Sequence, residues 1–248
     1  ITPQLLPARA AQNWKPDLEA LVANCDIPDG LLLASPANPT GVVMSDVELE
    51  AVCRWCDKHG VRLIMDEIYH GLSFGDPTRT ALAFTDNAII VNSFSKYFCM
   101  TGWRVGWVVL PDDLVQIGER LAQNLYISAP SINQMGAIAA FDCYKELNAH
   151  VPRYQENRDL LCRGLPTIFL GDHAPSDGAF YLYADVSALT DDSVGFAGRL
   201  LAETGVAITP GVDFDPFHGK THVRLSYAGS TKEIKKAVQR INAWLAKV

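Results

Sequence analysis

Residues 88–104 read AIIVNSFSKYFCMTGWR, an apolar run followed at once by polar side chains. Lys96 stands directly behind a Ser-Phe-Ser sequence, and Arg104 follows it by eight positions. The apolar part is short, rich in β-branched residues and without polar alternation, which is typical of a parallel-sheet strand covered on both faces. The stretch therefore predicts a buried strand that ends in a loop carrying an amine, two hydroxyls and a guanidinium.

Two further apolar runs precede polar residues in the same way. Residues 31–35 (LLLAS) lead to Asn38. Residues 61–65 (VRLIM) lead to Asp66, so that Asp66 and Lys96 follow Asn38 at successive intervals of about 30 residues, the length of a βαβ unit. Each of the three residues taken alone would be an ordinary turn residue. Because ligands of open α/β sheets bind beyond the carboxyl ends of the strands, we expect the three to converge on one site.

The segment between the first two runs is predicted to be a helix. Ser45 and Glu48 form a capping-box pattern at its start, and Gly60 is typical of a helix end. Its apolar side is expected to comprise Val47, Ala51, Val52 and Trp55. A strand, a helix and a strand in this order indicate an α/β sheet with parallel strands.

The rest of the chain continues with strands and helices and shows no internal repeat. Strands are predicted at residues 105–110, 179–186 and 206–209. Helices are predicted at residues 131–145 and 151–163 and at the carboxyl terminus, where Ser230 and Glu233 form a second capping box. The apolar side of the last helix is expected to comprise Ile234, Val238, Ile241 and Leu245.

The composition argues against nucleic-acid and membrane proteins. With 48% hydrophobic residues among 248, the chain can bury a sizeable core, and two domains are expected. A net charge of −7 argues against a broad nucleic-acid surface. No apolar run approaches the roughly 20 residues of a membrane span, and no signal peptide is visible. We therefore expect a cytoplasmic protein.

The cysteines do not indicate a metal or redox site. Among the six, only Cys53 and Cys56 are closely spaced, and they fall inside the predicted helix rather than at a strand-to-helix turn. No second pair completes a zinc site, so we expect two packed thiols and no metal. The glycine-rich and serine motifs of dinucleotide-binding proteins, P-loop proteins and serine hydrolases are absent as well.

Four motifs together resemble those of one enzyme family. They are SPANPTG at 35–41, DEIY at 66–69, SFSK at 93–96 with TGWRVG at 101–106, and VRLSYA at 223–228. In this order and spacing they resemble the class I/II aminotransferases, pyridoxal-phosphate enzymes of fold type I related to aspartate aminotransferase. The resemblance implies an α/β fold with a three-layer large domain of mostly parallel strands, partial here over residues 1–145. A smaller α+β domain over residues 146–248 would follow it.

The resemblance also implies catalytic residues. Lys96 would hold pyridoxal 5'-phosphate as a Schiff base and shuttle a proton to and from the substrate α-carbon. Asp66 would face the pyridine nitrogen of the cofactor and keep it protonated. Asn38 and Tyr69 would donate hydrogen bonds to the phenolic oxygen. The implied catalytic set is therefore Lys96, Asp66 and Tyr69.

Two anions would be bound by the other motif residues. Ser93, Ser95 and Arg104 would hold the cofactor phosphate, and Arg224 would hold the substrate α-carboxylate beside Asn38. A guanidinium offers a planar pair of donors that suits both anions.

Partners and alternatives follow from the same resemblance. It implies a homodimer that moves an amino group between an amino acid and a 2-oxo acid. Family members are longer, so we expect the chain to lack an amino-terminal portion with a phosphate-binding loop and a ring-stacking aromatic residue. A lyase of the same fold, and an aminotransferase-like sensor domain of a transcription regulator, stay open as alternatives.

Substrate choice has one weak indicator. In a family branch that prefers dicarboxylic substrates, a side-chain-binding arginine lies between the positions that match Arg104 and Arg224. Residues 125–134 contain no Arg or Lys, which counts against selectivity for aspartate or glutamate by this route.

Overall fold

The computed structural model describes residues 1–18 and 27–247, which divide into two compact units. Ile1–Asp17, Asn38–Val42 and Val151–Val248 form one unit, and Leu18–Ala37 and Val43–His150 form the other. We call them the three-stranded unit and the four-stranded unit, after their sheets. The chain passes for the last time from one unit to the other after His150, and its first residues belong to the three-stranded unit.

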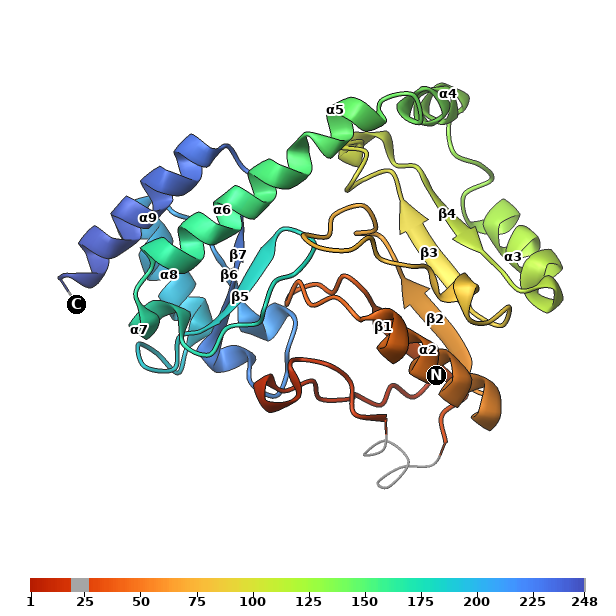
Figure 1. Ribbon diagram of the computed structural model, residues 1–248, viewed down its shortest axis with the longest axis horizontal. Helices are drawn as coiled ribbons and strands as arrows, with labels where there is room; N and C mark the ends of the chain where they lie inside the picture. Colours follow the sequence, from red (N-terminus) through yellow and green to blue (C-terminus); the bar gives the residue numbers. More distant parts are fainter. Residues whose placement is uncertain (19–26, 248) are drawn as a thin grey trace. The chain divides into compact units, whose positions relative to one another are not determined.

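The four-stranded sheet has the order β1-β2-β3-β4 (Figure 1). Its strands are β1 (Gly30–Ala34), β2 (Arg62–Asp66), β3 (Ile89–Ser93) and β4 (Gly106–Val109). The first three run parallel, and β4 returns antiparallel to β3. This sheet confirms the predicted α/β class, and the three apolar runs form its parallel strands.

Helix α2 (Asp46–His59) begins and ends where the sequence predicts. Both hydrogen bonds of the capping box are present between Ser45 and Glu48, and Gly60 ends the helix with φ +68°. The predicted apolar face is partly wrong, because Leu49, Val52, Cys53 and Cys56 are the buried residues and Val47 is 76% exposed. The side of the helix that faces the sheet therefore differs from the predicted apolar side and includes the two thiols.

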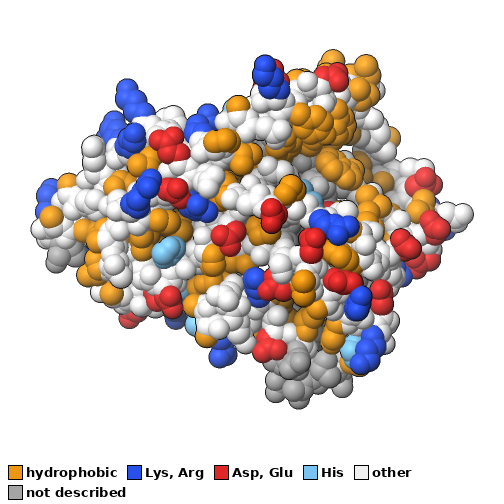
Figure 2. All heavy atoms as spheres, viewed as in Figure 1, with side chains coloured by type: hydrophobic (Ala, Val, Ile, Leu, Met, Phe, Trp, Pro, Cys, Tyr) orange, Lys and Arg blue, Asp and Glu red, His pale blue; other side chains and the backbone are white. Residues whose placement is uncertain are grey.

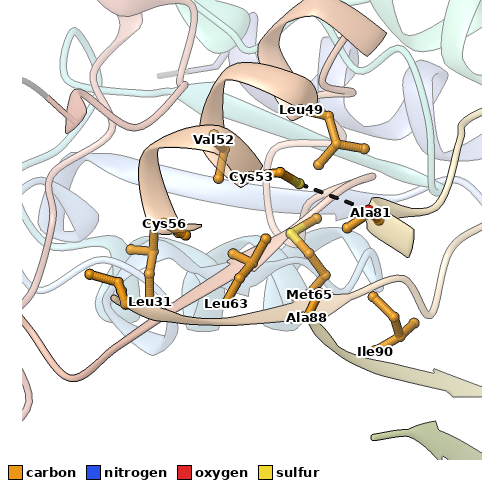
Figure 3. Close-up of a cluster of buried hydrophobic side chains, with 11 residues drawn as sticks. Leu31, Leu49, Val52, Cys53, Cys56, Leu63, Met65, Ala81, Ala88 and Ile90 are labelled. Carbon is orange, nitrogen blue, oxygen red and sulfur yellow. Dashed lines mark hydrogen bonds between the residues drawn. The ribbon is translucent and has the colours of Figure 1, made fainter. Parts of the chain in front are cut away.

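The core of this unit lies between α2 and the parallel strands. Figure 3 shows Leu49, Val52, Cys53 and Cys56 pointing from the helix toward side chains of the sheet. Those side chains are Leu31, Leu63, Met65 and Ile90, with Ala88 directly before β3. The Cys53 thiol donates a long contact of 3.9 Å to the carbonyl of Ala81, and burial raises the pKa of Cys53 to about 11. These cysteines are packed, protonated side chains, as expected.

The opposite face of the sheet is exposed, which corrects the expectation of strands covered on both faces. Leu32 is 68% exposed and Val91 is 40% exposed, and every residue of β4 is exposed. Among the residues that the structure describes, α2 and the short turn η2 (Ala81–Ala83) both pack against the same side of the sheet. In Figure 2, apolar side chains also gather at the upper right of the view, where Figure 1 places α4 and α5.

The remaining helices of the four-stranded unit differ from the prediction. The expected helix at 131–145 is interrupted and forms α4 (Ser131–Ala140) and α5 (Tyr144–Asn148). Helix α3 (Asp112–Leu125) was not predicted, although two acidic residues after Pro111 favour a helix start there. The turn η3 (Thr101–Trp103) precedes β4.

The three-stranded unit combines one antiparallel sheet with helices. The sheet has the order β5-β7-β6 and consists of β5 (Tyr181–Asp185), β6 (Thr209–Pro210) and β7 (His222–Ser226). Its helices are α6 (His150–Gly164), α7 (Thr167–Leu170), α8 (Ser193–Thr204) and α9 (Thr231–Leu245), with short turns η1 (Ala10–Gln12), η4 (Gly211–Asp213) and η5 (Gly219–Thr221). The capping box of Ser230 and Glu233 is confirmed at the start of α9.

Aromatic packing joins the first residues of the chain to this sheet. Trp14 lies edge-on to Tyr183 with ring centroids 5.4 Å apart, and edge-on to His222 at 5.5 Å. Val42 and Ala174 complete the cluster. Segments distant in sequence thus share one core within this unit.

Two valines of α2 test the packing of the four-stranded unit. Val52 is 4% exposed and Val47 is 76% exposed. We expect Val52→Ala to lower the free energy of unfolding by about 1–3 kcal/mol, since it removes two buried methyl groups and leaves a cavity. Val47→Ala should change it by less than about 0.5 kcal/mol. Urea denaturation of both variants measures the difference, and equal losses would contradict the position of this helix.

Candidate active site

The loop after β3 gathers the predicted phosphate-binding hydroxyls. Ser93 Oγ donates to the carbonyl of Val105 at 3.0 Å and lies 2.9 Å from Ser95 Oγ. The backbone N–H of Ser95 donates to Ser93 Oγ at 3.0 Å, which closes a tight turn directly at the strand end. The structure therefore brings Ser93 and Ser95 together next to Lys96, as predicted.

Arg104 belongs to the same loop. Thr101 Oγ1 donates to the carbonyl of Ser95 at 2.6 Å, and the guanidinium of Arg104 donates to the carbonyl of Thr101 at 3.0 Å. Arg104 has a left-handed backbone with φ +54° and is exposed. Within the described ranges no other hydrogen bond of this guanidinium is found, so most of its donors remain available to an anion.

Asp66 and Tyr69 leave the sheet beside this loop. Asp66 ends β2 and pairs with Val91 of β3, so its turn and the Ser93 loop start from the same edge. One carboxylate oxygen of Asp66 accepts the N–H of Ile68 at 3.0 Å. The amine of Lys96 lies 5.8 Å from the ring centroid of Tyr69. The turn and the loop thus bring Tyr69 and Lys96 near each other.

Next to Asp66 lies a polar pair that the sequence did not reveal, a buried Glu67 and a partly buried His70. Glu67 is only 2% exposed, and its carboxyl lies 3.4 Å from Nδ1 of His70. Burial raises the pKa of the Glu67 carboxyl, although hydrogen bonds from Ala81 and Thr80 oppose that shift. Burial also lowers the pKa of His70 to about 4. Both shifts disfavour the charged forms, so burial opposes an ion pair between the two side chains.

Asn38 and Arg224 meet in the three-stranded unit. The Arg224 guanidinium donates to Asn38 Oδ1 at 2.7 Å and to Thr209 Oγ1 at 3.3 Å. Arg224 projects from β7, and Thr209 pairs with it across the sheet from β6. Two of the predicted residues, 186 positions apart, are thereby in direct contact.

Two aromatic rings lie close to the same guanidinium. Its central carbon lies 4.2 Å from the ring centroid of Tyr181 and 4.4 Å from that of Phe214. Its Nε is buried and has no hydrogen-bond partner within the described residues. A guanidinium in contact with two rings, with an unsatisfied buried N–H, is a suitable site for a carboxylate. The sequence did not point to Thr209 or Phe214, which reach Arg224 only through the antiparallel sheet and the turn η4.

The predicted residues therefore fall into two groups. Lys96, its loop, Asp66 and Tyr69 lie in the four-stranded unit, whereas Asn38 and Arg224 lie in the three-stranded unit. Both groups present cations and hydroxyls suited to anions. Among the described residues there is no cluster of three or more His, Cys, Asp or Glu side chains that could hold a metal ion. Within the same residues no helix is both long and apolar enough to cross a bilayer.

Comparison with known proteins identifies the family. The family model of aminotransferase class I and II matches residues 1–241. The chain belongs to this family. It is 45% identical over 245 residues to valine–pyruvate aminotransferase of Mycobacterium tuberculosis. The aligned region covers 97% of this chain and 63% of that protein. The chain is 36% identical over 239 residues to aspartate/prephenate aminotransferase of Thermus thermophilus, covering 94% of this chain and 58% of that one.

Solved structures show the same fold. A crystal structure of an aminotransferase from Mycobacterium tuberculosis has a TM-score of 0.92 at 44% identity, covering 98% of this chain and 64% of that chain. An aspartate aminotransferase variant of Thermus thermophilus has a TM-score of 0.85 at 32% identity, covering 94% and 64%. The chain thus has the fold of these fold-type-I aminotransferases and spans 58–64% of the length of these relatives.

The partly buried His70 predicts a pH dependence of stability. Its pKa falls from 6.5 to about 4 on folding. Between these pH values the ring is protonated in the unfolded protein and neutral in the folded one. Its contribution is fully present above pH 6.5 and is lost as the pH falls toward 4, by about 3 kcal/mol in total. His70→Gln should therefore lose less stability than the wild-type protein between pH 7 and pH 4.

Urea unfolding at several pH values measures this difference. Glu67 is present in both proteins, and its raised pKa acts in the opposite direction, since its contribution is lost as the pH rises. Parallel stability curves for wild type and His70→Gln would contradict a buried neutral imidazole.

Proposed function

We propose that this chain forms part of a pyridoxal-phosphate-dependent aminotransferase that moves an amino group between an amino acid and a 2-oxo acid. The observation that carries the proposal is the placement of Lys96. It lies at a strand end, directly after the paired hydroxyls of Ser93 and Ser95 and in the same loop as the available guanidinium of Arg104, in a chain 45% identical to an aminotransferase. Such a loop suits a phosphate next to a reactive amine.

The residues of the four-stranded unit fit the cofactor. Ser93, Ser95 and Arg104 would bind its phosphate through two hydroxyls and a guanidinium. Asp66 would hold a proton on the pyridine nitrogen, and Tyr69 would donate a hydrogen bond to the phenolic oxygen. Bound pyridoxal 5'-phosphate supplies a sink for the electrons released when a bond to the substrate α-carbon breaks.

Lys96 would have two tasks in succession. Its Nζ would first hold the cofactor covalently. After the substrate amine has replaced it, Nζ would remove the proton from the substrate α-carbon. It would then deliver a proton to the cofactor. A single amine can do both because it remains within reach of the same atoms.

Arg224 would orient the substrate. The contacts with Tyr181 and Phe214 fix the plane of its guanidinium, and the unsatisfied Nε–H offers one of two parallel donors to a carboxylate. Every amino acid and 2-oxo acid carries this carboxylate, so the arrangement would serve both half-reactions. The relative named for valine and pyruvate makes an aliphatic amino acid with pyruvate the first pair to test.

We also propose that the protein acts as a homodimer. The support is an exposed apolar side of α3, on which Ile117 is 58%, Leu121 60% and Leu125 72% exposed. Contiguous apolar surface of this kind commonly marks an interaction site.

Replacing Lys96 tests the central role. Lys96→Ala should lose the visible absorption band of bound cofactor and the conversion of cofactor to its pyridoxamine form by an amino acid alone. The exposed Lys58→Ala is the matched control and should retain both. Retention of the band in Lys96→Ala would remove Lys96 from its role, and release of pyruvate and ammonia by the wild type would favour a lyase instead.

Replacing Arg224 tests substrate binding. Arg224→Lys keeps the charge but loses the planar pair of donors, so kcat/KM should fall about 10–100-fold for amino acid and oxo acid alike. Arg199→Lys, an exposed position in the same unit, should leave steady-state kinetics unchanged. An effect confined to one of the two substrates would contradict a common carboxylate site.

A further inference from the structure

Glu67 is an unusual residue to bury. Acidic side chains are almost never fully buried unless they are paired, and this one is 2% exposed. Its Oε1 accepts the N–H of Ala81 at 2.8 Å, and Thr80 donates a second hydrogen bond through its side chain. The carboxyl therefore holds the start of η2 against the end of β2.

The backbone of Glu67 and His70 closes the turn that carries Tyr69. The N–H of Glu67 donates to the carbonyl of Val91 at 2.9 Å, which extends the pairing of β2 with β3. The N–H of His70 donates to the carbonyl of Glu67 at 2.9 Å. Tyr69 thus sits inside a turn whose two ends are Glu67 and His70. A displacement of either end moves the phenol.

The side chains of the two end residues lock the same turn. Oε2 of Glu67 lies 3.4 Å from His70 Nδ1, and the imidazole also hydrogen-bonds the backbone of Ser35. Ser35 lies at the end of β1, where its N–H donates to the carbonyl of Asp66 at 3.2 Å. The pair therefore ties the Tyr69 turn to the ends of two neighbouring strands and to η2.

We propose that Glu67 and His70 are positioning residues for Tyr69: their hydrogen-bonded side chains fix the turn that aims the phenol toward the cofactor beside Lys96. This inference rests on the proposed function, because it deepens the role given there to Tyr69. Neither side chain acts on substrate or cofactor. Burial raises the pKa of Glu67 and lowers that of His70, so both shifts oppose charge in this pair.

Glutamine should replace Glu67 with little effect, and leucine should not. A glutamine keeps an oxygen for the Ala81 N–H and a polar group of the same shape toward His70. Leucine fills the volume but breaks both contacts. Tyr69→Phe removes the hydroxyl that the pair is inferred to aim, so it defines the largest effect that can pass through Tyr69.

The experiment measures the pH midpoint of the visible absorption change of bound cofactor, which reports hydrogen bonds to the cofactor directly. Tyr69→Phe should move this midpoint, and Glu67→Leu should move it in the same direction by about 0.5–1 pH unit. The double variant should show no further shift beyond Tyr69→Phe alone. Glu67→Gln should match the wild type.

A stability control separates positioning from general loosening. Val52→Ala weakens the same unit from within its core and should leave the midpoint unchanged. If Glu67→Leu fails to fold, His70→Phe takes its place, since it keeps a ring of similar size and loses the Nδ1 contact. Thermal melting of the cofactor-free variants shows which of them fold.

Two results would overturn the proposal. One is an unchanged midpoint in Glu67→Leu, or in His70→Phe if that variant is used. The other is a double variant with Tyr69→Phe whose midpoint shift equals the sum of the two single shifts. Failure of the proposed function looks different, because then the wild type itself shows no visible band.

Discussion

The parallel pairing of β2 with β3 is the constraint on which the candidate active site of the four-stranded unit depends. Asp66 pairs with Val91, so both strands end at one edge of the sheet. The turn after β2 and the loop after β3 therefore emerge beside each other. Their closeness is visible in the 5.8 Å between the amine of Lys96 and the ring of Tyr69. With a different register, the amine and the phenol would not lie close to each other.

Much of this could be predicted from sequence because the signals are local. The strand runs are short and apolar, and the capping boxes at Ser45 and Ser230 each join residues only three positions apart. Burial was predicted less well. The composition of β3 is the same whether one or both of its faces are covered. Residues far away in the sequence determine which faces are covered. For that reason Val91 is exposed although it lies in an apolar run.

The surroundings of the two site arginines show the same division. Arg104 finds its partner Thr101 within its own loop, so the motif contained the arrangement. Arg224 depends on Thr209 from the neighbouring strand and on Phe214 from a turn, and only the antiparallel sheet brings them to the guanidinium. Family motifs pointed to the charged residue, while its neutral neighbours carry no pattern that sequence alone reveals.

Borohydride reduction in the presence of pyridoxal 5'-phosphate, followed by peptide mass spectrometry, would identify the amine that holds the cofactor. The reagent fixes the cofactor to whichever amine it has condensed with. We expect one stoichiometric label on the peptide that contains Lys96, and less of that label when excess amino acid is present. A label spread over surface lysines, or a stoichiometric label on another residue, would contradict it.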